Sequence, residues 1–316
     1  MNIAEFTSSV VAETGKIILG KAEKTELILI ALLSEGHVLL DDLPGVGKTT
    51  LVKTLSVVLG CESKRIQFVP DLMPNDILGM NIYDRGSGAF RLMKGPVFTN
   101  LLLADEINRA VPRTQAALLE AMEEQSVTID GETLDLPSPF IVMATQNPVE
   151  AESTFRLPAA QMDRFMIKLS MGYPTAQEEK EMLLRLGDSI PFPQLKAVSS
   201  PEEIIRLRKE ASAVSVSEAV MEYIVALTSA SRSMPELVMG TSPRASRALF
   251  KASKVRAAML GRSFVTPDDV KYLAPYVLTH RILLSSSARL SGKTPEKILK
   301  SIIESVPVPP GQKEIF

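Results

Sequence analysis

The run Gly45-Val46-Gly47-Lys48-Thr49 holds the residue types that bind a nucleotide phosphate. Glycines let the backbone turn so that several N–H groups point into one concavity, a lysine can reach the β- and γ-phosphates, and a hydroxyl can ligate Mg²⁺. An apolar run at 37–40 precedes it and a helical pattern begins at Leu51, which completes a Walker A arrangement. A turn that only joins a strand to a helix is the alternative. We expect ATP to contact Pro44, Gly45, Val46, Gly47, Lys48, Thr49 and Thr50.

One position departs from the generic loop. The pattern G-x-x-x-x-G-K-[ST] places glycine at position 42, where this chain has Asp42. A carboxylate there repels a triphosphate unless its side chain points away, and the sequence leaves that direction open. Lys48 and Thr49 themselves match the pattern.

Two carboxylates, Asp105 and Glu106, come directly after the apolar run 101–104. Alone, an apolar run ending in Asp-Glu is typical of a surface strand end, but after a Walker A loop it indicates a Walker B motif. We expect Mg²⁺ to be held by Thr49 and, through water, by Asp105. Glu106 is then the residue that polarises the attacking water.

The elements that must position these residues alternate between helix and strand. Helical patterns cover about 3–19 and 21–34, and apolar runs predict strands at 37–41, 65–68, 101–105, 140–145 and 165–169. This alternation predicts a doubly wound α/β domain with a parallel sheet, whose ligands lie beyond the carboxyl ends of the strands. Asn147 follows one such end, where its amide could orient the attacking water, or it only turns the chain before Pro148.

Further segments lie between the strands, and a second domain follows them. Residues 79–97 indicate an exposed β-ribbon or loop, and alternation around Asp130-Gly131 predicts a hairpin over 126–136. From position 175 on, capping boxes and Ser-Pro or Thr-Pro pairs open one helix after another. We therefore predict an α/β domain over 1–174, an all-α lid domain over 175–305 and an extended, proline-rich tail over 306–316.

Composition limits the function classes. The chain has 316 residues and one cysteine, so an intrachain disulfide is impossible. No stretch approaches the roughly 18 apolar residues of a membrane span, and the basic start of a signal peptide is missing, so we expect a cytoplasmic protein. Residues 1–200 carry 18 Lys/Arg and 26 Asp/Glu, a balance of −8, and residues 201–316 carry 17 and 11, a balance of +6. These are either two solvated surfaces or parts of neighbouring copies that face each other.

A basic stripe follows Pro243, because Arg244, Arg247, Lys251 and Lys254 recur at helical spacing. A solvated helix face is one interpretation. The other is that Arg244, fixed directly after the helix start, is brought by a helical lid onto a bound phosphate.

Taken together, these stretches resemble the MoxR family of AAA+ ATPases. The similarity covers nearly the whole chain and lies in the joint order of 43–49, 65–68, 70–72, 95–98, 103–110, 114–116, 118–122, 144–148, 161–165 and 242–245. Two positions depart from it: Arg156 stands where relatives often have proline, and Ala159 where they often have glutamate.

The resemblance implies a ring, commonly a hexamer, with ATP and Mg²⁺ bound between subunits. Asn147 would be sensor 1, Arg244 sensor 2 and Arg164 an arginine finger inserted into the neighbour's site. The segments 79–97 and 126–136 would be the helix-2 insert and the pre-sensor hairpin. It further implies chaperone-like remodelling of a client protein complex, often with a partner that carries a von Willebrand A domain. Adenine would be approached by Ile18, Leu19 and Gly20.

Two other functions stay open at this point. A nucleic-acid motor, or a motor subunit like that of magnesium chelatase, is favoured by the basic stripe and by Arg85, Arg91 and Lys94. The net charge of −2, the lack of tryptophan and the lack of a nucleic-acid module argue against it, so nucleic acid is not an expected partner. A scaffold that binds ATP with little turnover is the other alternative.

Overall fold

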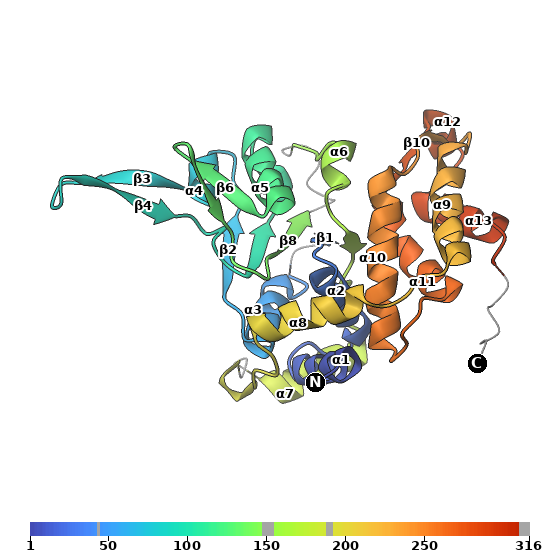
Figure 1. Ribbon diagram of the computed structural model, residues 1–316, viewed down its shortest axis with the longest axis horizontal. Coiled ribbons are helices and arrows are strands. Elements are labelled where there is room, and N and C mark those ends of the chain that lie inside the picture. The colour runs from blue at the N-terminus through green and yellow to red at the C-terminus, as the bar shows by residue number, and fades with distance from the viewer. Residues whose placement is uncertain (43–44, 147–154, 188–191, 310–316) are drawn as a thin grey trace.

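The computed structural model describes residues 1–42, 45–146, 155–187 and 192–309 (Figure 1). Its centre is a five-stranded sheet with the order β2-β5-β8-β1-β9, and the pairs are parallel. The predicted α/β class is therefore confirmed. The strands are β1 (Val38–Asp41), β2 (Ser63–Gln67), β5 (Leu101–Asp105), β8 (Ile141–Gln146) and β9 (Ile167–Leu169).

Apolar side chains of the strands enter a different core on each face of the sheet. In β1, Val38 and Leu40 belong to one buried cluster and Leu39 to the other. Both faces are covered because the connections between parallel strands place helices on each side of the sheet. One face carries α1 (Ile3–Thr14), α2 (Ala22–Leu33) and α3 (Lys48–Leu59), and the other carries α4 (Pro74–Leu78), η1 (Ile107–Arg109), α5 (Pro112–Glu124) and α6 (Ala159–Met162).

The first helix is shorter than the predicted span of about 3–19. It ends at Thr14, with Gly15 as the C-cap, and residues up to Gly20 form a turn. Gly15, a poor helix former, caps the helix although the apolar pattern continues, and Gly20, with a left-handed φ of 69°, ends the turn before α2.

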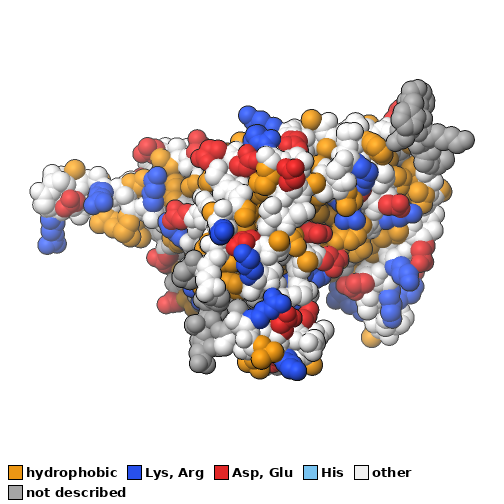
Figure 2. Space-filling model, turned by 90° about the horizontal axis from the view of Figure 1, so that it is seen from below, with side chains coloured by type: hydrophobic (Ala, Val, Ile, Leu, Met, Phe, Trp, Pro, Cys, Tyr) orange, Lys and Arg blue, Asp and Glu red, His pale blue; other side chains and the backbone are white. Residues whose placement is uncertain are grey.

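Two antiparallel hairpins leave the sheet. β3 (Gly79–Asp84) pairs with β4 (Ala89–Lys94), and β6 (Ser126–Ile129) pairs with β7 (Glu132–Asp135). The first hairpin is an arm that extends from the body of the molecule, with Tyr83 and Phe90 exposed on it (Figure 1). Figure 2 shows hydrophobic and basic side chains gathered along this arm.

The C-terminal part is helical, as predicted. The helix α8 (Pro201–Ser212) packs against α1, α2 and α10, and the helices that follow it form a bundle (Figure 1). A short antiparallel ribbon, β10 (Leu237–Met239) with β11 (Leu283–Leu284), corrects the all-α expectation. The helices are α7 (Ala176–Leu186), η3 (Phe192–Gln194), α8 (Pro201–Ser212), α9 (Glu218–Arg232), α10 (Pro243–Met259), α11 (Pro267–Leu278), η4 (Thr279–Arg281), α12 (Ser286–Leu290) and α13 (Pro295–Ser305).

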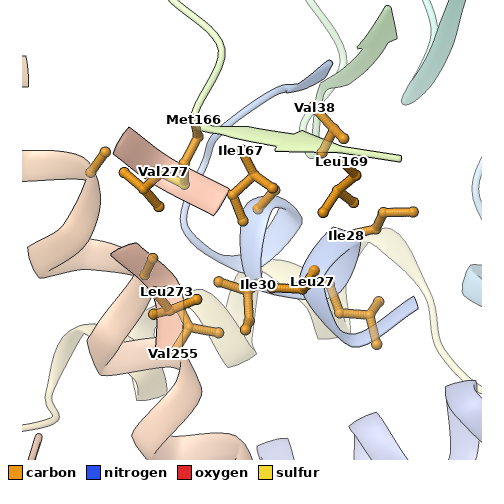
Figure 3. Close-up of a cluster of buried hydrophobic side chains, with 14 of the residues drawn as sticks. Leu27, Ile28, Ile30, Val38, Met166, Ile167, Leu169, Val255, Leu273 and Val277 are labelled. Atoms are coloured by element: carbon orange, nitrogen blue, oxygen red, sulfur yellow. The ribbon is translucent and has the colours of Figure 1, made fainter. Parts of the chain in front are cut away.

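The helical bundle packs on the α/β part through apolar side chains. Leu273 and Val277 of α11 and Val255 of α10 belong to the same cluster as Ile30 of α2 and Ile167 of β9 (Figure 3). Since all five are at most 2% exposed, this joint fixes the bundle relative to the sheet. Among the described residues, the helices are all too short or too polar to cross a bilayer.

Candidate nucleotide site

The candidate phosphate loop joins β1 to α3. Gly45 and Gly47 have φ of 82° and 83°, in the left-handed region that favours glycine. A Cβ placed on either would have no heavy atom within 4 Å, so both glycines border open space. α3 begins at Lys48, and its N-terminus, a favourable place for an anion, borders the same space. Pro44 lies outside the described residues, and its contact with ATP stays a prediction.

A pocket of about 390 Å³ connects this loop to the carboxyl ends of β2 and β5. The predicted phosphate ligands, metal ligands and base meet in it. Val46 instead packs against the main hydrophobic core. The residues that line the pocket are Gly45, Gly47, Lys48, Thr49, Thr50, Arg65, Gln67, Asp105 and Glu106.

The predicted metal ligand Asp105 is held from both neighbouring strands. Its Oδ1 accepts a hydrogen bond of 2.6 Å from the hydroxyl of Thr145 on β8. Its Oδ2 pairs with the guanidinium of Arg65 on β2 at 2.7 Å. The carboxylate therefore has a fixed orientation at the mouth of the pocket.

The predicted base Glu106 has an unusual backbone. Its φ is 57°, a left-handed conformation that non-glycine residues adopt rarely, and its N–H donates to the Thr145 hydroxyl at 2.8 Å. The carboxylate accepts hydrogen bonds from Gln67 Nε2 at 2.6 Å and from Arg109 Nη1 at 2.9 Å. Backbone strain at a pocket residue is typical of functional sites.

Sequence reasoning assigned no role to Arg65, Gln67, Arg109 or Thr145, although they hold the acidic pair. Arg65 and Gln67 alternate along β2, and Thr145 is the only polar residue in the run 140–145. The rule that ligands lie at the carboxyl ends of parallel strands could have found three of the four.

Asp42 points away from the pocket. Its carboxylate is buried and accepts three hydrogen bonds: 2.7 Å from the Ser170 hydroxyl, 2.6 Å from Met171 N–H and 3.0 Å from Gly172 N–H. Its main-chain carbonyl accepts a hydrogen bond of 3.2 Å from Lys48 Nζ. The residue that replaces the first glycine of the generic loop therefore ties that loop to the chain after β9.

The candidate adenine residues Ile18, Leu19 and Gly20 lie in the turn between α1 and α2. A Cβ on Gly20 would lie 1.4 Å from Oε1 of Glu178, and Lys21 donates to the carbonyl oxygen of Tyr173 at 3.3 Å. The turn is thus next to the segment that Asp42 binds. In the part of the chain that the structure describes, these three residues do not line the phosphate pocket.

Arg164 and Arg244 lie together in a second pocket, of about 270 Å³. Glu123, at the end of α5, accepts a hydrogen bond from Arg244 and pairs with Arg164 at 2.7 Å. Arg164 also donates to the carbonyl oxygen of Leu119 at 2.8 Å. Asn147, the third residue predicted to act on the γ-phosphate, lies outside the described residues.

The two pockets lie at opposite ends of the strands, the phosphate pocket at the carboxyl ends and the pocket of Arg164 at the amino ends. The phosphate loop follows β1, whereas Arg164 precedes β9, which runs parallel to β1. The backbone N–H of Met166, two residues after Arg164, donates to the carbonyl of His37 just before β1. β1 has four residues, and a strand of that size is about 13 Å long. Among the described residues, those lining one pocket do not line the other.

Comparisons with known proteins agree with this geometry. Residues 37–167 match the model of the ATPase family associated with various cellular activities (AAA), and residues 229–302 match an AAA lid domain. The chain is 47% identical to protein YeaC of Bacillus subtilis, over 95% of this chain and 93% of YeaC. It is 43% identical to chaperone MoxR1 of Mycobacterium tuberculosis, over 94% of this chain and 81% of that protein. The chain belongs to the MoxR family of AAA+ ATPases.

A solved structure supports the family fold over the full length. The crystal structure of a candidate ATPase from Cytophaga hutchinsonii superimposes with a TM-score of 0.91 at 37% identity, and covers 98% of this chain and 96% of that one. A homologue of a magnesium-chelatase subunit from Methanocaldococcus jannaschii is more distant, at 29% identity over 58% of this chain. The MoxR interpretation is thus confirmed, and nucleotide binding follows from the family.

The pocket residues fit a magnesium nucleotide. Left-handed glycines face open space, Lys48 supplies a cation, and Thr49 with Asp105 supplies the oxygen ligands that Mg²⁺ prefers. Asp42, the one carboxylate that seemed out of place in the loop, is turned into the protein.

Proposed function

We propose that this MoxR-family protein hydrolyses ATP to ADP and phosphate with Mg²⁺, as a ring of identical subunits. AAA+ proteins are commonly oligomeric, and we propose a hexamer. The work of the ring is remodelling, maturation or activation of a client protein complex in the cytoplasm.

The separation of the two pockets is the observation that carries this proposal. Lys48, Asp105 and Glu106 share the phosphate pocket at the carboxyl ends of the strands, while Arg164 and Arg244 lie at the amino ends. An arginine side chain does not span that distance. A site that uses these arginines is therefore completed by a second copy.

The predicted base, the phosphate-binding lysine and the metal ligands have separate proposed tasks. Glu106 polarises the attacking water, and Gln67 and Arg109 hold its carboxylate in place. Lys48 binds the β- and γ-phosphates, and Asn147 orients the water or contacts the γ-phosphate. Bound Mg²⁺ would neutralise phosphate charge, held by Thr49 and, through water, by Asp105.

Arg164 and Arg244 are proposed to act on the nucleotide of the neighbouring subunit. In the single chain, Glu123 pairs with both. A neighbour's phosphates carry more negative charge than one carboxylate, so they can displace Glu123. Hydrolysis would then depend on assembly, since the positive charge that stabilises the transition state comes from another subunit.

Client contact is proposed for the arm formed by β3 and β4. Phe90 is 73% exposed and Tyr83 is 54% exposed, an unusual amount for aromatic side chains. Arg85, Arg91 and Lys94 add positive charge to the arm. A partner with a von Willebrand A domain is proposed on the family resemblance alone.

Steady-state phosphate release tests the enzymatic part. We expect Glu106→Gln to lose at least about 100-fold in turnover, as removal of a general base does, and to retain nucleotide binding. Glu120→Gln, an exposed carboxylate on α5, is the matched control and should behave like the parent. Background-level phosphate release by the parent itself would instead support a nucleotide-gated scaffold, and equal, measurable release by both proteins would refute Glu106 as the base. Co-purification of proteins with the Glu106→Gln variant in the presence of ATP would then identify the client.

A further inference from the structure

A buried polar cluster joins the helical bundle to the residues on both sides of Arg164. Arg281, in η4, is only 3% exposed. Its Nη2 donates to the carbonyl oxygen of Phe165 at 2.6 Å, and its Nε lies 3.4 Å from Oδ1 of Asp163. His280 Nε2 lies 2.9 Å from the same carbonyl oxygen. The residue before Arg164 and the residue after it are thus both bound by η4.

The same Asp163 also binds the start of α10. Its Oδ2 accepts a hydrogen bond of 2.7 Å from the hydroxyl of Ser242, the N-cap residue of α10. Arg244 is in the first turn of that helix, and its Nη1 lies 4.0 Å from the same oxygen. One carboxylate therefore connects the chain at Arg164 with the helix that carries Arg244.

Stability alone does not explain this cluster, because burying charged groups costs desolvation free energy. Replacing a buried ion pair by packed apolar side chains is often neutral or stabilising. Burial lowers the pKa of Arg281 to about 10, and Asp163 opposes that effect, so the guanidinium stays charged at neutral pH. Arg281 Nη1 has no hydrogen-bond partner among the described residues, and Arg281 lines the same pocket as Arg164 and Arg244.

We propose that Arg281 and Asp163 are positioning residues that hold Arg164 and Arg244 in a fixed relation, so that the helical bundle determines how both arginines are presented to a neighbouring subunit. This inference rests on the proposed function, in which both arginines act between subunits. Neither Arg281 nor Asp163 is proposed to touch the nucleotide.

The test uses Arg281→Met, Arg281→Lys and Asp163→Asn in the full-length protein. We expect the nucleotide Kd of each to stay within about twofold of the parent, because the phosphate pocket lies at the other end of the strands. The kcat of phosphate release should fall about tenfold or more for Arg281→Met and less for Arg281→Lys, which keeps the charge. Lys293→Met, which removes an exposed ion pair with Glu236 in the same bundle, is the matched control.

Mixing with Glu106→Gln separates positioning from general damage. Arg281→Met subunits have an intact phosphate pocket, and a Glu106→Gln neighbour offers them intact arginines, so mixed rings should regain turnover. Thermal unfolding shows whether each variant is folded. If Arg281→Met does not fold, Arg281→Lys and Asp163→Asn still test the positioning role.

The outcomes distinguish the inference from its premise. Parent-like turnover in all three variants would overturn the positioning role, as would a loss that mixing does not restore. Arg164→Ala, assayed in parallel, tests the premise: if it keeps full turnover, the proposed function fails independently of Arg281.

Discussion

Asp42 offers a quantitative test of how the phosphate loop is held. Its buried carboxylate accepts hydrogen bonds from Ser170, Met171 and Gly172, residues that follow β9. Asp42→Ala would leave two backbone N–H groups and one hydroxyl without this acceptor. Asp41, its neighbour, makes a single ion pair with Lys168 at 2.5 Å and is partly exposed, which makes it a matched control.

The expected magnitudes differ widely. An unsatisfied buried donor costs about 1–3 kcal/mol, and only the Met171 N–H is fully buried, whereas Ser170 is exposed and Gly172 is half-buried, so we expect a loss of about 2–4 kcal/mol of unfolding free energy. Asp41→Ala should cost about 0–1 kcal/mol, as is usual for partly exposed ion pairs. Asp42→Asn should fall between them, because its amide oxygen can still accept hydrogen bonds while its NH₂ group faces a donor.

Urea unfolding of the three variants measures these differences as changes in midpoint at constant m value. Nucleotide titration is the second assay. Because the Asp42 carbonyl binds Lys48, we expect Asp42→Ala, and not Asp41→Ala, to weaken nucleotide binding. Equal losses of stability in Asp41→Ala and Asp42→Ala would refute the reasoning.

Three further outcomes are expected. Lys48→Ala should weaken nucleotide binding at least about 100-fold in a fluorescence titration; binding at parent affinity would contradict the loop assignment. Thr145→Val should lower Mg²⁺-dependent phosphate release about 10- to 100-fold, because one hydroxyl holds both Asp105 and Glu106, while Thr145→Ser should retain most of it. Burial lowers the pKa of His37 to about 4. As pH falls, the imidazole is therefore protonated in the unfolded chain before it is protonated in the folded protein. The folded protein loses about 3 kcal/mol of unfolding free energy as pH falls from about 6.5 to about 4. Urea unfolding of the parent and His37→Gln across this range measures that loss, and parallel curves would rule it out.

The α/β core and the composition of its pocket could be predicted because they depend on local pattern. A glycine-rich loop after one apolar run, and Asp105 and Glu106 after another, lie at the same end of the sheet wherever both strands are parallel members of it, and here only β8 separates β1 from β5. Gln67 could be placed at this end of the sheet by the same rule, but its contact with Glu106 could not be predicted, because it depends on β2 lying next to β5. Strand order is set by the whole chain and not by any one run.

Contacts between distant segments account for the rest. The direction of Asp42 depends on Ser170, which comes 128 residues later. β10 and β11 have three and two residues and are separated by α10, α11 and η4, so each is too short to show an alternating hydrophobic pattern. The sequence indicated Arg244 as a phosphate contact but not that it shares a pocket with Arg164, since that proximity comes from the packing of α10 and α11 against α2 and β9.

The most direct measurement of the central claim is phosphate release by mixtures of Arg164→Ala and Glu106→Gln subunits. Each variant alone should be nearly inactive, the first because its neighbour receives no arginine and the second because its own base is missing. Mixed rings contain pairs in which the intact pocket of an Arg164→Ala subunit faces the intact arginine of a Glu106→Gln subunit. The account predicts turnover that rises to a maximum at intermediate ratios, and inactivity at every ratio would contradict it.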